Sequence, residues 1–593
     1  MKRNEVEEKY TWDLRDLFAT EEDYEEAIRS LTQDAEAFAK KAWNLTSADA
    51  VLASVREMEE FTVRLDHIMS YASLDFSVDM SDSVRSARYG KAGLFYGKIS
   101  GIFTEFENAL KKVPDEILLE AAKEKGYYMY LTNIVRAKKH ALPDDVEKAL
   151  TALSPVLGAP MDIYEQALHA DLRYDEIEVG GKNVPMSFVA FENEYQVSSD
   201  TALRRKSFEV FSRELRKYEN VIAAAYNTQV QKEKILATMR GFDSVIDALL
   251  FEQRVDRELY DRQIDTIMEK LAPVMRRYAM LVKHAYGLDE MTFADLKAPL
   301  MKDFAPTLTI EESKAYVDKA LSVMGKEYMA KIENYLPERF VDYVQNEGKT
   351  SGGFCSSPYR VHPYILLSWT GVLGELFTLV HELGHGAHFA LAQEKWNNLA
   401  TDISTYLVEA PSTFNEMLLS HSLLRESDDP KFRAFVLSSM IENTYYHNFV
   451  THLLEAHYQR EVYKLVDAGE VLDAAKLSEL KRATLEKFWG DAVTINEGAE
   501  LTWMRQAHYY MGLYSYTYSA GLTVSTVGSE NILKEGEPAV KRWLDFLRAG
   551  GTDDVIGLAK IAGVDITTDK PLLETIAHLD EIVTELESME KKF

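Results

Sequence analysis

Residues 376–388 read LFTLVHELGHGAH, and the interpretation of the whole chain starts from this stretch. Its apolar first turn predicts a buried helix. At about 100° per residue, His381 and His385 lie one turn apart on one face of that helix, where two imidazoles can converge on a metal ion. Gly384 and Gly386 each cost about 1 kcal/mol inside a helix, so we expect either a closely packed neighbour or a nearby helix end.

The spacing of this motif also supplies a mechanism. Zinc suits two neutral imidazoles plus a carboxylate and leaves a coordination position for water, whose pKa then falls towards neutrality. Glu382 is adjacent to the ligands and can take the proton of that water. The rival interpretation is a pair of surface or core histidines on an ordinary helix.

The third ligand decides the subclass. A metzincin-type helix requires a glycine and a histidine at positions that here hold His388 and Leu391, so that subclass is excluded. His388 lies about 10 Å along the axis from His381, too far to share one ion, and we expect it to pack beside the site or to hydrogen-bond there. Residues 406–416 supply two better candidates, Glu409 and Glu416.

In the rest of the chain, the spacing of apolar residues predicts mainly helices. A short apolar run, Tyr364 to Trp369, predicts a strand just before the metal helix, either an ordinary buried strand or one whose edge pairs with a peptide. Residues 346–358 form a loop rich in turn-forming residues, a composition often found at sites. From residue 21 to about residue 172, apolar residues recur at helical spacing.

The main boundary is expected near residue 200. Residues 176–184 alternate around Gly180-Gly181, as in a β-hairpin, and residues 198–200 resemble a helix N-cap. These signals predict an N-terminal helical domain, 1–200, and a catalytic domain, 201–593.

The composition of the chain limits its expected partners and its expected compartment. The 593 residues carry a formal charge of -29, which disfavours nucleic acid and anionic lipid as partners. We find no apolar run of 18 residues and no signal-peptide pattern, so we expect a cytoplasmic protein without a membrane span. The single cysteine, Cys355, excludes an internal disulfide and is expected to be a small packed residue.

Three segments resemble one family, the thimet oligopeptidase and oligoendopeptidase F group of zinc peptidases. Residues 381–388 are similar to its metal helix, and residues 408–412 to the segment that carries its third ligand. Residues 508–521 are similar to a loop whose His and Tyr side chains contact the substrate carbonyl. The N-terminal stretch 10–18, YTWDLRDLF, further resembles the oligoendopeptidase F branch.

The resemblance implies specific residue roles. It makes Glu409 the third ligand, beside His381 and His385, of one zinc ion per chain. Through residues 508–521 it implies His508, Tyr514 and Tyr518 as donors to the oxyanion, with the division between the two tyrosines left open. The rival interpretation of this segment is an aromatic packing cluster, and Tyr516 is read as a core residue. Glu416 lies on nearly the same helix face as Glu409 and is a candidate to orient a ligand imidazole.

The resemblance also implies the architecture and the activity. We expect a mainly α, zincin-like (gluzincin) fold, an elongated helical body around a deep substrate channel, with a small β-element next to the metal helix. The implied function is a zinc metalloendopeptidase that hydrolyses internal bonds of short, unstructured oligopeptides. Two alternatives remain: a dipeptidyl carboxypeptidase-type exopeptidase, and a non-catalytic peptide-binding protein, whose signature would be a lost ligand or base.

Overall fold

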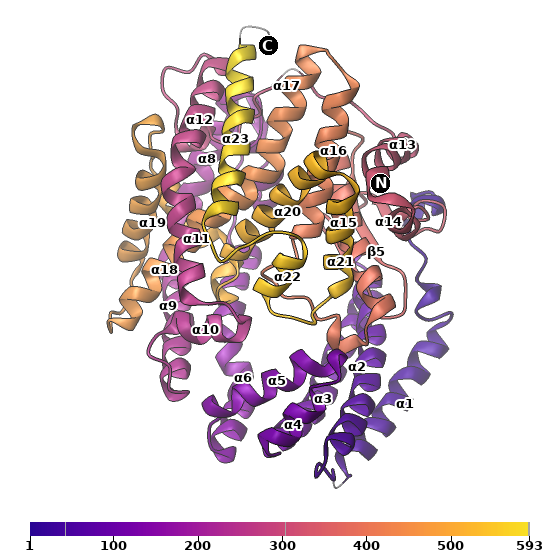
Figure 1. The fold of residues 1–593 in the computed structure, drawn as a ribbon. Coiled ribbons are helices and arrows are strands. Elements are labelled where there is room, and N and C mark those ends of the chain that lie inside the picture. The colour runs from indigo at the N-terminus through magenta and orange to yellow at the C-terminus, as the bar shows by residue number, and fades with distance from the viewer. Residues whose placement is uncertain (42, 303, 591–593) are drawn as a thin grey trace.

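Helices dominate the structure, a computed structural model that describes residues 1–41, 43–302 and 304–590 (Figure 1). The predicted mainly α fold class is confirmed. The elements of the first half are α1 (Glu21–Ala39), α2 (Ala48–Ser77), α3 (Ser83–Leu110), α4 (Asp115–Ala121), α5 (Tyr128–Ala137), α6 (Asp144–Glu165), β1 (Ile177–Val179), β2 (Lys182–Val184), α7 (Phe188–Ala190), α8 (Thr201–Arg216), α9 (Glu219–Met239), α10 (Val245–Gln253), α11 (Arg257–Lys270) and α12 (Ala272–Tyr286).

The second half contains the small sheet and the long helices that surround it. Its elements are α13 (Ile310–Leu321), α14 (Gly325–Ile332), β3 (Val341–Val344), β4 (Phe354–Ser356), β5 (Tyr364–Trp369), α15 (Glu375–Lys395), α16 (Ala410–Glu426), α17 (Pro430–Ser439), α18 (His452–Asp467), α19 (Ala474–Trp489), α20 (Ser515–Glu535), α21 (Glu537–Ala549), α22 (Val555–Ile561) and α23 (Lys570–Met589). A π-helical segment, Met440–Thr451, leads into α18.

Two large core clusters divide the apolar residues. One lies between Tyr24 and Ile134, in the helices at the bottom of Figure 1, and the other runs from Tyr164 to Met589. The domain boundary near residue 200 stays a prediction.

The local signals before residue 201 are confirmed. Strands β1 and β2 pair antiparallel around Gly180 and Gly181, whose φ angles of 59° and 76° suit a tight hairpin turn. The Asp200 side chain accepts hydrogen bonds from the backbone N–H groups of Ala202 and Leu203 and so caps α8.

The strand predicted at 364–369 is present as β5, but it has no free edge. It is the central strand of a three-stranded sheet, parallel to β3 on one side and antiparallel to β4 on the other. Five of its six residues are buried, and such a run is typical of a strand covered on both faces. The suggestion that a peptide pairs with the edge of β5 is therefore wrong.

The N-terminal segment is attached to this sheet. Trp12 is buried, and its ring packs edge-on against Tyr364 of β5 with centroids 6.1 Å apart. The backbone N–H of Asp13 donates to the carbonyl of Arg339, just before β3. Asp342 of β3 is fully buried and pairs with both Arg3 and Lys349. Residues far apart in sequence thus fix the sheet that lies beside α15.

Helices α15 and α16 approach each other closely at Gly384. A Cβ placed there would lie 2.4 Å from the carbonyl oxygen of Pro411 and 2.7 Å from Cα of Ser412. Gly386 faces Pro363 in the same way, at 3.1 Å. Of the two explanations for glycine in this helix, close packing is therefore confirmed.

A search of the described residues finds no helix with the length and apolar character that a bilayer-crossing segment requires.

Because backbone atoms face Gly384, we expect Gly384→Ala to force α15 and α16 apart and to lower the free energy of unfolding by about 1–3 kcal/mol. Thermal unfolding measures this loss. Gly158→Ala is the matched control, since no atom lies within 4 Å of its added Cβ in α6, and it should be neutral or stabilising by about 0.5–1 kcal/mol. Equal stability of the two variants would contradict the packing argument.

Candidate metal centre

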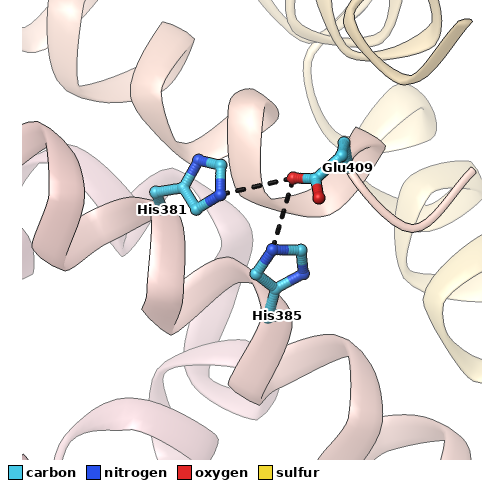
Figure 2. A group of neighbouring side chains, drawn as sticks. All are labelled: His381, His385 and Glu409. Carbon is cyan, nitrogen blue, oxygen red and sulfur yellow. Dashed lines mark ion pairs between the residues drawn. The ribbon is translucent and has the colours of Figure 1, made fainter. Parts of the chain in front are cut away.

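The structure brings His381, His385 and Glu409 together (Figure 2). The histidines lie on one face of α15, and Glu409 is the residue directly before α16. Oε2 of Glu409 lies 3.3 Å from Nε2 of His381 and 3.4 Å from Nε2 of His385. Three atoms able to bind a metal therefore face one point.

These distances fit a metal ion. Ligand atoms held about 2.0–2.1 Å from a tetrahedral zinc ion lie about 3.3–3.5 Å from one another, which matches both nitrogen–oxygen separations. Two imidazoles and a carboxylate are also the donor set of a site that keeps one position open for water. The geometry and the chemistry of the three residues both fit zinc.

Glu416 contacts the ring nitrogen of His381 that faces away from Glu409. The Nδ1–H of His381 donates to Oε1 of Glu416 at 2.7 Å, which leaves the Nε2 lone pair directed at Glu409. Thr444, from the π-helical segment, donates to the other oxygen of Glu416. The position is the one suggested for Glu416 on helical spacing, and its orienting role stays a prediction.

Glu382 lies next to the three candidate ligands with its carboxylate uncommitted. Within the described part of the chain, no side chain or backbone group hydrogen-bonds to it, although the residue is only 5% exposed. Burial raises the pKa of this carboxyl, more than the neighbouring imidazoles lower it. A raised pKa suits a group that must take up a proton near neutral pH.

His388 and Cys355, two residues near the motif, are packed among other side chains. His388 is 1% exposed, neither of its ring nitrogens has a hydrogen-bond partner among the described residues, and burial lowers its pKa to about 3. Its ring lies against those of Phe389 and Phe546. Cys355 lies in β4 with its sulfur beside α15, and burial raises the pKa of its thiol.

His508, Tyr514 and Tyr518 form a separate aromatic group near Glu409. Their ring centroids lie 5.3–5.6 Å apart. Burial raises the pKa of both tyrosines, and the nearby charge of Glu409 raises it further. Both phenols therefore stay protonated, as hydrogen-bond donors must. Tyr516 points elsewhere: it is 1% exposed, and its hydroxyl donates to Gln253 in the core.

Sequence reasoning missed a cluster of titratable side chains that includes His508. Its members are His447, His452, Glu455 and His508, and it is called the Glu455 cluster below. Oε2 of Glu455 accepts from Nδ1 of His452 at 2.7 Å and lies 3.6 Å from Nδ1 of His508. Nε2 of His452 lies 3.0 Å from Nε2 of His447. His452, Glu455 and His508 also meet the distance criterion for metal binding. The available signal was weak, since a histidine three residues before a glutamate is common on helices.

Comparisons with known proteins identify relatives of this chain. A sequence model of peptidase family M3 matches residues 195–578, and a model described as oligopeptidase F matches residues 110–174. Oligopeptidase PepF of Bacillus subtilis is 29% identical over 593 residues, which cover 99% of this chain and 88% of the relative. The resemblance inferred from the three motif segments is confirmed.

Solved structures share the fold. The crystal structure of a Chlamydophila abortus protein superposes with a TM-score of 0.85 at 22% identity and covers 99% of each chain. Oligoendopeptidase-F from Enterococcus faecium gives a TM-score of 0.75 at 22% identity, over 96% of this chain and 99% of that one.

Loss of the negative charge on Glu416 should weaken metal binding without removing a ligand. We expect Glu416→Gln to lower zinc affinity about 10- to 100-fold, because an amide holds the His381 tautomer less strongly. Competition with a chromophoric chelator measures the affinity. Glu426→Gln, an exposed change on the same helix, is the control and should bind as the unchanged protein does. Unaltered affinity in Glu416→Gln would remove its orienting role.

Proposed function

The chain belongs to peptidase family M3, and from this premise we propose that it is a zinc-dependent endopeptidase that cuts internal bonds of short, unfolded peptides. The observation that carries the proposal is the convergence of His381, His385 and Glu409 on one point, with the free carboxylate of Glu382 beside them. A bound zinc ion supplies a Lewis acid that polarises the scissile carbonyl and acidifies the attacking water. One ion per chain is expected.

Glu382 is proposed as the general base. Its oxygens are free to accept a hydrogen bond from water, and its raised pKa lets it hold the proton and pass it to the leaving amine. The backbone of Gly353 lies beside it: a Cβ placed there would be 3.4 Å from Oε1 of Glu382. The same Cβ would lie 2.9 Å from Cγ2 of Thr378, so glycine at this position lets the backbone pack closely against α15 beside the base.

His508, Tyr514 and Tyr518 are proposed to stabilise the oxyanion. Donors directed at developing charge contribute more in the transition state than in the ground state. Glu455 is proposed to hold the Nδ1 side of His508, which leaves Nε2 for another partner. Tyr514 and Tyr518 both lie close enough to feel the charge of Glu409, so the division of roles between them stays open.

Strand β4 offers the free edge that β5 lacks. Among the described residues β4 pairs only with β5, and Gly353 at its start lies beside Glu382. We propose that an extended substrate adds to the outer edge of β4, which brings one peptide carbonyl towards the metal ligands. Because pairing through the main chain involves few substrate side chains, we expect the protein to accept peptides of many different sequences. The channel expected from the family architecture would exclude folded proteins.

The role of Glu382 is tested by Glu382→Gln. Because the amide cannot take a proton, we expect kcat on a quenched fluorogenic peptide to fall about 10²- to 10⁴-fold while zinc content stays at one per chain. Glu394→Gln, an exposed change near the end of the same helix, should leave both values unchanged. Full turnover by Glu382→Gln would overturn the assignment.

The mode of cleavage is tested with a peptide acetylated at its N-terminus and amidated at its C-terminus. We expect internal cuts, identified by mass spectrometry, that stop when zinc is chelated and return when zinc is added. Release of terminal dipeptides alone, blocked by amidation, would support a dipeptidyl carboxypeptidase instead. Absence of any chelator-sensitive cleavage would support the non-catalytic alternative.

A further inference from the structure

A pocket with a mainly apolar lining and several charged side chains borders the Glu455 cluster, and apart from Glu455 its residues have no part in the chemistry proposed so far. It offers about 70 Å³ to the centres of water molecules. A single water needs about 10–15 Å³ of such space, so a small polar group and several waters fit. Its charged lining comes from separate parts of the chain: Lys297, Glu455, Lys481 and Arg505.

The charges around this pocket do not balance. Arg505 is paired with Glu192 at 2.5 Å. Glu455 is already engaged, since it accepts hydrogen bonds from His452 and from the hydroxyl of Ser515. Three cations, Lys297, Lys481 and Arg505, therefore face two carboxylates, Glu192 and Glu455. One positive charge is left over.

The cations without a carboxylate partner are Lys297 and Lys481. Lys481 of α19 is 4% exposed, and among the described residues its ammonium contacts only the hydroxyl of Tyr509, at 3.5 Å, and the ring of Tyr458, at 5.5 Å. Burial lowers its pKa to about 8. A buried ammonium without a carboxylate partner is costly, and an incoming anion would offset that cost.

Lys297 lies in the turn after residues 293–295, and its ammonium is freer than that of Lys481 to bind an anion. Within the described residues it makes no hydrogen bond and no ion pair. Its side chain is exposed to water, yet surrounding protein lowers its pKa by desolvation. Exposure and desolvation together indicate an ammonium that projects into an internal hollow, not from the outer surface.

We propose that this pocket is a subsite that binds a carboxylate of the substrate peptide, with Lys297 and Lys481 as its charged partners. The proposal rests on the proposed function. Two observations point to the peptide as the source of the anion. Glu455 lines the pocket and also contacts His508, so the pocket adjoins the residues proposed to act on the substrate. Every peptide with a free C-terminus carries a carboxylate, whereas its ammonium end would be repelled here.

Four fluorogenic peptides distinguish the sources of the carboxylate. One pair has neutral residues and ends in a free acid or an amide. A second pair is amidated and carries Glu or Gln as its last residue. If the α-carboxylate binds, the free acid of the first pair has a KM about ten-fold below that of its amide, the effect of one charge-assisted hydrogen bond. If a side-chain carboxylate binds, the Glu peptide has the lower KM in the second pair.

Substitutions at Lys297 connect the preference to the pocket. Lys297→Met should raise KM for the preferred peptide to that of its uncharged partner, with kcat and the uncharged peptide unaffected. Lys297→Glu should reverse the preference. Lys326→Met removes an exposed lysine of α14 that does not line the pocket, and it should keep the preference. Because the Lys297 side chain faces water, these changes should leave folding intact.

Each outcome decides the matter. Equal KM values within both pairs for the unchanged protein, or an equal loss on all four peptides in Lys297→Met, would overturn the subsite while cleavage itself continues. A lack of chelator-sensitive cleavage of any peptide would overturn the proposed function and this subsite with it. Binding of the free acid and the amide to Glu382→Gln, followed by fluorescence anisotropy, separates the two failures because it needs no turnover.

Discussion

The close approach of α15 to α16 at Gly384 is the constraint on which the site depends. Only a residue without a side chain lets the backbone of Pro411 and Ser412 come within contact distance of the metal helix. That contact places the start of α16, and with it Glu409, over the two imidazoles. The same helix then brings Glu416 to the opposite nitrogen of His381. One small residue therefore determines where both Glu409, the proposed ligand, and Glu416, the proposed orienting group, lie relative to His381.

Local features of the fold were predictable from the sequence, and long-range arrangement was not. Helical spacing placed His381 and His385 on one face, and the Gly-Gly turn at 180–181 fixed the hairpin, because both effects act within a few residues. The position of β5 within its sheet depends on pairing with β3 and β4, which lie outside the segment itself, and the pattern of residues 364–369 does not specify those partners. Its lack of apolar and polar alternation was the one signal of a central strand.

The site also contains residues that local sequence patterns could identify and residues that only the fold brings together. Glu409 and Glu416 were within reach of sequence reasoning because a conspicuous motif directs the search to the next helix. Glu455 and Lys297 belong to no motif, and their importance comes from what surrounds them after folding. Desolvation lowers the pKa of Lys297, whereas for Glu455 the effect of burial is outweighed by His452 and His508, which lower its pKa. Groups with displaced pKa values gather where a protein does chemistry or binds charge. Only three-dimensional coordinates reveal that setting.

The attachment of the N-terminal segment to the sheet bears on how the chain is made. Arg339 donates to the carbonyl of Thr11, a partner 328 residues earlier in sequence. At a synthesis rate of about 5–20 residues per second, roughly 18–70 seconds pass between the synthesis of Trp12 and that of Tyr364 in β5, which packs against it. Throughout that interval the nascent chain presents an uncovered indole near its leading end. Docking of this segment is therefore a late event, and it completes the sheet only after the residues that precede the metal helix have left the ribosome.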